Sequence, residues 1–261
     1  MSYKFETGRN LHSFDGKPLI GVTTGLSIMD KPELTWWASG MACAELGWLN
    51  TKKSGKEDRL VSAGQKLTDI KGMDIKTYLA LLDKAYSAHN THKKEKAGTG
   101  KNMHALLEEF IGAKIAGQDE FLPDETILPF VTWSNANVKK FLFSELNCYS
   151  RTLWCGGIAD FGYVDMDGNY VLGDFKSSNA VYFTQWAQCG AYDILIGENG
   201  GYDSGGNKVY ESTFPFKYHA IFAAGMGLDK PTFNYDTIPT REAFCHALSL
   251  YKSKLFFEAK A

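Results

Sequence analysis

The chain has 261 residues, of which 44% are hydrophobic and 22% are charged, as in an ordinary folded protein. This composition excludes an intrinsically disordered chain, because it supplies enough apolar side chains to form a core. The 28 basic and 30 acidic side chains give a net charge of −2, which excludes a protein that coats DNA over much of its surface. Any contact with nucleic acid must therefore be local.

Short strands followed by a helix are predicted at the start of the chain. A turn signal at 14–17 and a β-rich run at 19–24 indicate short strands within residues 1–30. Apolar and aromatic residues then recur at helical spacing, which predicts a helix over 34–49.

The next part of the chain is predicted to be mainly helical. Residues 50–73 are polar and mixed, and a helix is expected over about 75–88. A polar, lysine-rich break at 89–100 follows, and a further helix begins after it at about 101–117. Thr99 is a candidate N-cap for that helix.

A change from helices to strands is predicted near residue 145. A helix is expected over 124–143, although Pro129 lies within its first turns. The character of the sequence changes at 145, and three short strands are predicted at 145–154, 157–166 and 169–176, as an antiparallel meander. The last two strands are joined by Asp167 and Gly168, which form a strong hairpin signal.

The remaining elements complete an α+β, or mixed α/β, arrangement. A helix over 183–196, a glycine-rich loop at 197–208, a strand over 214–224 and an amphipathic helix over 240–259 are expected. No internal repeat and no change in composition divides the sequence. We therefore expect residues 1–261 to form a single domain.

The cysteines and the apolar runs bear on cofactors and location. Five cysteines are scattered through the chain without a C-x-x-C pair, which predicts free thiols rather than disulfides or a thiolate zinc site. No apolar run reaches the ~18 residues of a membrane span, and the first residues lack the apolar core of a signal peptide. We therefore expect a cytoplasmic protein with no membrane partner.

Acidic residues on the predicted hairpin are candidates for a metal site. Residues two apart on a strand share a face, so Asp174 and Lys176 should point together while Phe175 points into the opposite layer. The hairpin can bring Asp160 close to Asp174. Two carboxylates and a nearby main-chain carbonyl supply the hard oxygen ligands that Mg²⁺ prefers. Lys176 would then orient water or stabilise negative charge during hydrolysis.

Polar faces of two predicted helices accompany this hairpin. Taken alone, a D-x-K pattern is more often a surface ion pair than a catalytic site. However, His104 and Glu108 share one helix face, and Gln188 and Tyr192 share a face of another helix, together with Gln185. Each of these groups has a purely structural explanation, but together they are typical of one polar cleft.

The combination resembles a known nuclease family. Gly157-Ile158-Ala159-Asp160, then Asp174-Phe175-Lys176, then Gln188 and Tyr192 are similar to motifs of the RecB-like branch of the PD-(D/E)XK superfamily. Gly98-Thr99 with His104 and Glu108 is similar to its first motif, and Glu145 lies where relatives often carry a glutamate. The resemblance spans about 98–192. More loosely, residues 15–24 resemble the openings of phage-type and mitochondrial-genome-maintenance exonucleases.

The resemblance implies a role for each matching residue. His104, Asp160, Asp174 and the main-chain carbonyl of Phe175 would bind Mg²⁺ or Mn²⁺, and Lys176 would activate the attacking water. Gln188 and Tyr192 would position the substrate or brace the lysine, and Glu108 would be an outer or second-metal carboxylate. A histidine ligand favours Mn²⁺ somewhat. The scattered cysteines imply that there is no iron–sulfur cluster.

The resemblance also implies a fold and an activity. We expect a restriction-endonuclease-like core with a central mixed sheet flanked by helices: a catalytic core at 98–224, decorated by residues 1–73 and a C-terminal helix at 240–261. The implied activity is exonucleolytic hydrolysis of single- or double-stranded DNA with a free end.

The implied setting is DNA replication, recombination or repair, in a bacterial host or a phage-infected cell. A recombination or single-strand-binding protein is an expected partner. Two alternatives remain: a catalytically silent DNA-binding accessory module, and a site-specific endonuclease on the same fold.

Overall fold

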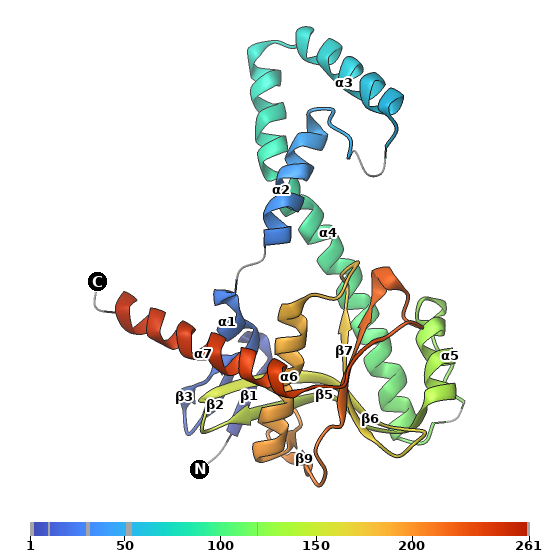
Figure 1. Cartoon of the computed structure of the whole chain (residues 1–261), viewed down its shortest axis with the longest axis vertical. Helices are drawn as coiled ribbons and strands as arrows, with labels where there is room; N and C mark the ends of the chain where they lie inside the picture. Colours follow the sequence, from blue (N-terminus) through green and yellow to red (C-terminus); the bar gives the residue numbers. More distant parts are fainter. Residues whose placement is uncertain (1–2, 10, 30–31, 51–53, 119, 260–261) are drawn as a thin grey trace. The chain divides into compact units, whose positions relative to one another are not determined.

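The protein has a mixed α+β fold with a central mixed sheet flanked by helices, as predicted (Figure 1). The computed structural model describes residues 3–9, 11–29, 32–50, 54–118 and 120–259. Contacts divide the chain into two compact units, one formed by Met1–Met29 with Gly100–Ala261 and the other by Asp30–Thr99. No helix in the described part of the chain is long and apolar enough to cross a membrane.

The first residues form a small sheet that leads into the large one. Strands β1 (Tyr3–Glu6), β2 (Leu11–Phe14) and β3 (Lys17–Pro18) pair in sequence as an antiparallel sheet. Strand β4 (Ile20–Gly21) then joins the large sheet by pairing in parallel with β6, and the short helix α1 (Val22–Gly25) follows. The opening of the chain is therefore part of the same unit as the central sheet.

The large sheet has eight strands and carries the hairpin singled out in the sequence. Its main path runs β11-β10-β7-β6-β5-β8-β9, and only the β10–β7 and β4–β6 pairs are parallel. Its remaining strands are β5 (Val138–Ser150), β6 (Cys155–Asp165), β7 (Tyr170–Lys176), β8 (Gly201–Tyr202), β9 (Lys208–Tyr210), β10 (Tyr218–Ala223) and β11 (Thr232–Asn234). Gly168 has a φ of 88°, the left-handed conformation that the predicted β6–β7 turn requires.

Helices cover both faces of this sheet (Figure 1). On one face, α4 (Ile75–Ile115) and α5 (Leu128–Asn137) bury apolar side chains against Phe161 and Phe175 of β6 and β7. On the other face, α6 (Phe183–Asn199) and α7 (Ile238–Glu258) pack on a second cluster that includes Leu172. Cover on both faces explains why β6 and β7 are apolar along most of their length.

The second unit consists of helices. It holds α2 (Pro32–Glu45), α3 (Lys56–Lys71) and the first part of α4. None of the residues of α3 is buried. The boundary between the two units falls inside α4, between Thr99 and Gly100.

Three predictions of local structure are wrong. The predicted break at 89–100 is helical, because α4 continues through it, so Thr99 caps no helix start. Lysine, glutamate and alanine in this segment are strong helix formers even without an apolar stripe. The predicted helix at 124–143 ends at Asn137, and β5 begins at Val138 because Phe141 and Phe143 are buried in the sheet. The predicted loop at 197–208 contains strand β8 and the start of β9.

Candidate metal centre

Acidic residues from neighbouring central strands lie in one row across the sheet. Ser144 pairs with Phe161 and Leu146 pairs with Ala159, so Glu145 lies across from Asp160. The β6–β7 pairing ends at Phe161 and Gly173, the residues next to Asp160 and Asp174, and the charges of these two aspartates are close enough to interact. Residues that face each other on antiparallel strands point to the same side of a sheet. The row therefore brings together carboxylates from β5, β6 and β7.

The two aspartates predicted to share an ion differ in their surroundings. Asp160 accepts a hydrogen bond on Oδ2 from the main-chain N–H of Phe175, at 2.7 Å. Asp174 is 1% exposed; its Oδ2 lies 2.5 Å from Nζ of Lys176, and its buried Oδ1 has no hydrogen-bond partner among the described residues. Burial raises the pKa of Asp174 to about 6, against the attraction of Lys176. A buried carboxylate oxygen without a partner is costly unless another ligand, such as a cation, satisfies it.

Helix α4 brings His104 to the same row. Its Nδ1 lies 3.8 Å from Oδ2 of Asp160, and its ring lies edge-on to Phe175 with ring centroids 6.0 Å apart. Burial lowers the pKa of His104, which favours the neutral imidazole that can coordinate a metal. One side-chain donor atom each from His104, Glu145 and Asp160 lies within 4.8 Å of the other two. These atoms are close enough to share one ion, whereas Asp174, which was predicted as a ligand, has no donor atom in this group.

Glu145 is a member of this cluster that sequence reasoning did not assign to the ion. It lies inside β5 with a φ of 47°, a left-handed conformation that costs a non-glycine residue about 1–2 kcal/mol. Burial, together with the charges of Asp160, Glu108 and Asp174, raises the pKa of Glu145 to about 8. Strain of this kind concentrates at functional sites. The sequence signal for it came from the resemblance alone, since the family that the chain resembles often carries a glutamate ahead of the G-x-x-D strand.

Lys176 completes the charged centre on the face predicted for it. Burial alone would lower its pKa, but the neighbouring carboxylates of Asp174 and Asp160 raise it overall, so the side chain is an ammonium ion. Lys176 pairs with Ala223 of the neighbouring strand β10, and it follows Asp174 by two residues along β7. One fixed positive charge therefore lies beside the carboxylates.

Helix α6 contributes Gln188 and Tyr192, but not Gln185. The Nε2 atom of Gln188 donates to the hydroxyl of Tyr192 at 2.7 Å. Burial, together with the charges of Asp174 and Asp160, raises the pKa of the tyrosine well above its usual range, so its hydroxyl stays protonated near the centre. Gln185 instead caps the helix, because its Oε1 accepts from the main-chain N–H of Tyr182 at 2.9 Å.

Glu108 lies one turn beyond His104 and remains exposed. It does not belong to the cluster of donor atoms formed by His104, Glu145 and Asp160. It is nevertheless close enough to raise the pKa of Glu145.

The donor set fits a divalent cation with oxygen ligands. Carboxylates suit Mg²⁺ and Mn²⁺, and one imidazole shifts the preference toward Mn²⁺. The Oδ1 atom of Asp174 has no partner among the described residues, and the pKa of Glu145 is raised by burial and by the acids around it. Both features are expected at a site where a bound cation would neutralise closely spaced carboxylates.

Comparison with known proteins finds no matching family model and no matching curated protein.

Proposed function

We propose that this protein is a metal-dependent nuclease that hydrolyses phosphodiester bonds in DNA, with a centre of the PD-(D/E)XK type. One observation carries the proposal: Glu145, Asp160 and Asp174 come from three neighbouring strands into one row, beside His104 and the buried ammonium group of Lys176. A surface ion pair, the ordinary explanation of a D-x-K pattern, would not leave Asp174 1% exposed.

The donor atoms of the row would hold the ion. His104, Asp160 and Glu145 supply the donor atoms that lie together. We propose that the unpartnered Oδ1 of Asp174 and the main-chain carbonyl of Phe175 complete the set of ligands. When bound, Mg²⁺ or Mn²⁺ lowers the pKa of coordinated water and polarises a phosphoryl oxygen. The N–H group of Phe175 fixes the orientation of Asp160, so this ligand is positioned before substrate binds.

Lys176 has a role that follows from its charge. Because its pKa is raised, it has no free lone pair with which to remove a proton from water. It acts instead by donating hydrogen bonds that orient the attacking water and stabilise the negative charge that develops on the phosphate. Gln188 and Tyr192 form a hydrogen-bonded pair beside the centre that positions the substrate backbone.

The proposed substrate is DNA with a free end, and the proposed mode is exonucleolytic, within replication, recombination or repair. A test uses end-labelled linear DNA with Mn²⁺, Mg²⁺ or EDTA. We expect cleavage with either metal and none with EDTA. Lys176→Ala and Asp174→Asn should each reduce the rate by about 100-fold or more.

Matched controls separate catalysis from a general change in charge. Lys230→Ala and Asp167→Asn alter exposed residues away from the row and should keep the wild-type rate. If Lys176→Ala cleaves as fast as Lys230→Ala, the role given to Lys176 is wrong.

The same assay distinguishes the two rival functions. A silent DNA-binding module would bind labelled DNA without cleaving it in any metal. A site-specific endonuclease would cut closed circular DNA into discrete fragments, whereas an exonuclease would leave the circle intact.

A further inference from the structure

The central sheet has an opening beside the row of acids. On one side, strand β6 pairs with β4 at Cys155 and Gly156, and with β7 from Phe161 to Val164. Between these two partners, no described strand pairs with residues 157–160 on that side, although β5 pairs with this stretch on the other side. Asp160 lies at one end of the opening.

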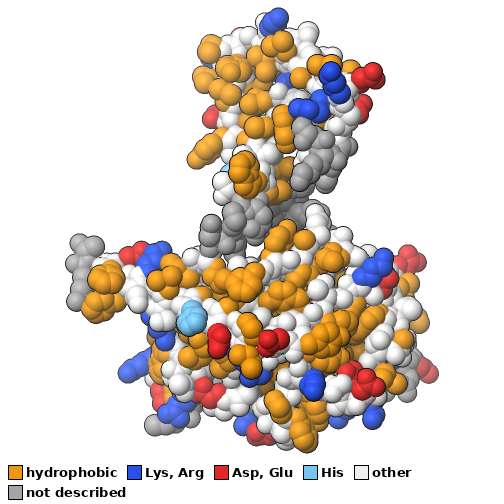
Figure 2. Space-filling view, in the orientation of Figure 1, with side chains coloured by type: hydrophobic (Ala, Val, Ile, Leu, Met, Phe, Trp, Pro, Cys, Tyr) orange, Lys and Arg blue, Asp and Glu red, His pale blue; other side chains and the backbone are white. Residues whose placement is uncertain are grey.

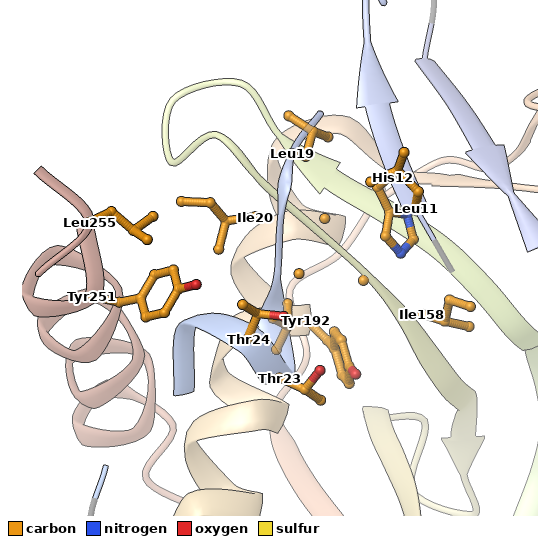
Figure 3. Close-up of a pocket in the computed structure, with 14 residues that line it drawn as sticks. Leu11, His12, Leu19, Ile20, Thr23, Thr24, Ile158, Tyr192, Tyr251 and Leu255 are labelled. Carbon is orange, nitrogen blue, oxygen red and sulfur yellow. The ribbon is translucent and has the colours of Figure 1, made fainter. Parts of the chain in front are cut away.

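A cavity of about 340 Å³ lies at the other end of this opening (Figure 3). Its floor includes the main chain of Gly156 and Gly157, and its wall includes Ile158. Two residues along a strand span about 6.8 Å, so Ile158 lies only that far from Asp160. Tyr192 lines the cavity and is also close enough to Asp160 for their charges to interact. The cavity and the proposed metal centre are therefore neighbours.

A residue larger than glycine at Gly156 or Gly157 would change the shape of the cavity. A Cβ atom at Gly157 would lie 2.7 Å from Cε1 of Tyr192 and 2.9 Å from Cγ2 of Val22. A Cβ atom at Gly156 would lie 2.7 Å from Cβ of His12. These clashes would displace the side chains that border the cavity.

The described walls are apolar and aromatic, with a few polar groups. Leucine, isoleucine and valine side chains alternate with the rings of Tyr192 and Tyr251 and with the hydroxyls of Thr23 and Thr24. Figure 3 shows Tyr251 entering from α7 and His12 entering from the opposite side. Among the described residues, none that lines the cavity is Lys, Arg, Asp or Glu. A phosphate group would not be favoured there, because nothing offsets its charge.

His12 adds a directed hydrogen-bonding group. It is 4% exposed, and its Nδ1 lies 2.6 Å from the hydroxyl of Tyr3. No described residue forms a hydrogen bond with its Nε2, and Figure 3 shows the imidazole beside the strand that carries Ile158. Burial lowers the pKa of His12 to about 4, so the ring is neutral at physiological pH.

A flat, uncharged ligand with polar edges matches such a cavity. Aromatic and aliphatic walls contact the faces of a ring, and a few placed polar groups bond to its edge. We propose that this cavity binds the nucleobase of the nucleotide next to the scissile phosphate, while the phosphate itself lies at the row of acids. This inference rests on the nuclease function proposed above.

Substrates that lack one base test this proposal. Cleavage is measured on single-stranded oligonucleotides in which one nucleotide at a time, counted from each end, is abasic. For the wild-type protein, an abasic nucleotide at one position next to the cleaved bond should raise KM about tenfold, as expected for one stacked base, with kcat little changed.

Substitutions at the rim of the cavity test whether the rise in KM on removal of a base originates there. Leu255 is 41% exposed and lines the cavity from α7, so Leu255→Trp should fill it without disturbing the core. KM for intact DNA should rise about tenfold in this variant, and removal of the base should then have less than a twofold effect. Leu250→Trp, on the same helix and 60% exposed but outside the cavity, is the matched control and should behave as wild type. Thr23→Val removes an exposed hydroxyl and should reduce the base effect without filling the cavity.

The possible failures are distinguishable. If the wild-type protein cleaves every abasic substrate with an unchanged KM, or if Leu255→Trp keeps the full base effect, the cavity is not a base site and the nuclease function stands. If the wild-type protein cleaves no DNA in any metal, the proposed function itself fails and the base site fails with it.

Discussion

The two compact units of this chain differ in what holds them together. The sheet unit encloses large side chains almost completely, among them Phe130, Phe161 and Phe222. In the unit Asp30–Thr99, the only buried apolar side chains among those described are Leu81 and Ala85. Figure 2 shows exposed hydrophobic side chains over its helices, at the top of the view.

Local interactions take the place of a core in the helical unit. The carboxylate of Asp74 accepts hydrogen bonds from the main-chain N–H groups of Lys76 and Thr77 at the start of α4, at 2.8 and 3.0 Å. Asp58 bonds to the N–H of Gly55 at the start of α3, and Lys84 pairs with Glu45 at 2.7 Å. Such contacts contribute about 1 kcal/mol or less each. The sheet unit can therefore hold a strained, charged centre, whereas the helical unit has little stability to offset such costs.

The largest expected effect comes from removing a core ring behind the metal centre. Phe175 is 3% exposed and stacks on Phe161 with ring centroids 4.5 Å apart. Phe175→Ala should lower the free energy of unfolding by about 3–5 kcal/mol, because it leaves a cavity between sheet and helices. Urea unfolding followed by circular dichroism measures this change. A loss below about 1 kcal/mol would contradict the assignment of this layer as core.

The next effect is a dependence of stability on pH that originates in the sheet unit. The pKa of His12 is lowered from 6.5 to about 4 by burial, so between these values the unfolded chain binds a proton that the folded chain does not. The contribution of His12 to the free energy of unfolding is therefore fully present above pH 6.5. It is lost as the pH drops toward 4, by about 3 kcal/mol in total.

The variant His12→Gln should lose this part of the acid sensitivity. Unfolding free energies at pH 7.5 and pH 4.5 are compared for the wild type and the variant. An equal loss of stability in both proteins would show that His12 is not the group responsible.

A smaller effect concerns the strain at Glu145. Its left-handed conformation suits glycine, so Glu145→Gly should be more stable than Glu145→Ala by about 1 kcal/mol, although both lack the carboxylate. Both variants should cleave DNA more slowly than wild type. Thermal unfolding of the metal-free proteins gives the stability difference. Equal stability of the two variants would mean that β5 stores no strain at this residue.

The smallest effect is expected in the helical unit. Val61 in α3 is 71% exposed, so Val61→Ala should change the free energy of unfolding by less than about 0.5 kcal/mol. Urea unfolding alongside Phe175→Ala provides the comparison. A loss above about 1 kcal/mol would show that this side chain is buried in solution and would remove the contrast between the units.

The sequence was sufficient where the controlling interactions are local. Asp167 and Gly168 specify the β6–β7 turn, and the alternation along β7 separates Asp174 and Lys176 from Phe175. These features predicted the hairpin at the centre of the fold. The placement of His104 followed only from a family resemblance, since nothing in its own helix indicates where the helix packs.

The failed prediction at the start of β5, and two features that were not predicted, depend on contacts between distant segments. Pairing shifts between Val138 and Lys140, and again between Phe141 and Phe143, so the start of β5 lacks the regular alternation that identifies a strand. The left-handed residue Glu145 and the opening beside β6 arise from strand pairing across the sheet. Neither has a signature in a short stretch of sequence.

The central claim is that one divalent ion is shared by residues of β5, β6, β7 and α4. Anomalous diffraction from a crystal soaked in Mn²⁺ tests it most directly. We expect a manganese peak in contact with His104, Asp160 and Asp174, and its loss in a crystal of Asp174→Asn. Saturating Mn²⁺ with no peak at these residues, or with the ion bound only elsewhere, would contradict it.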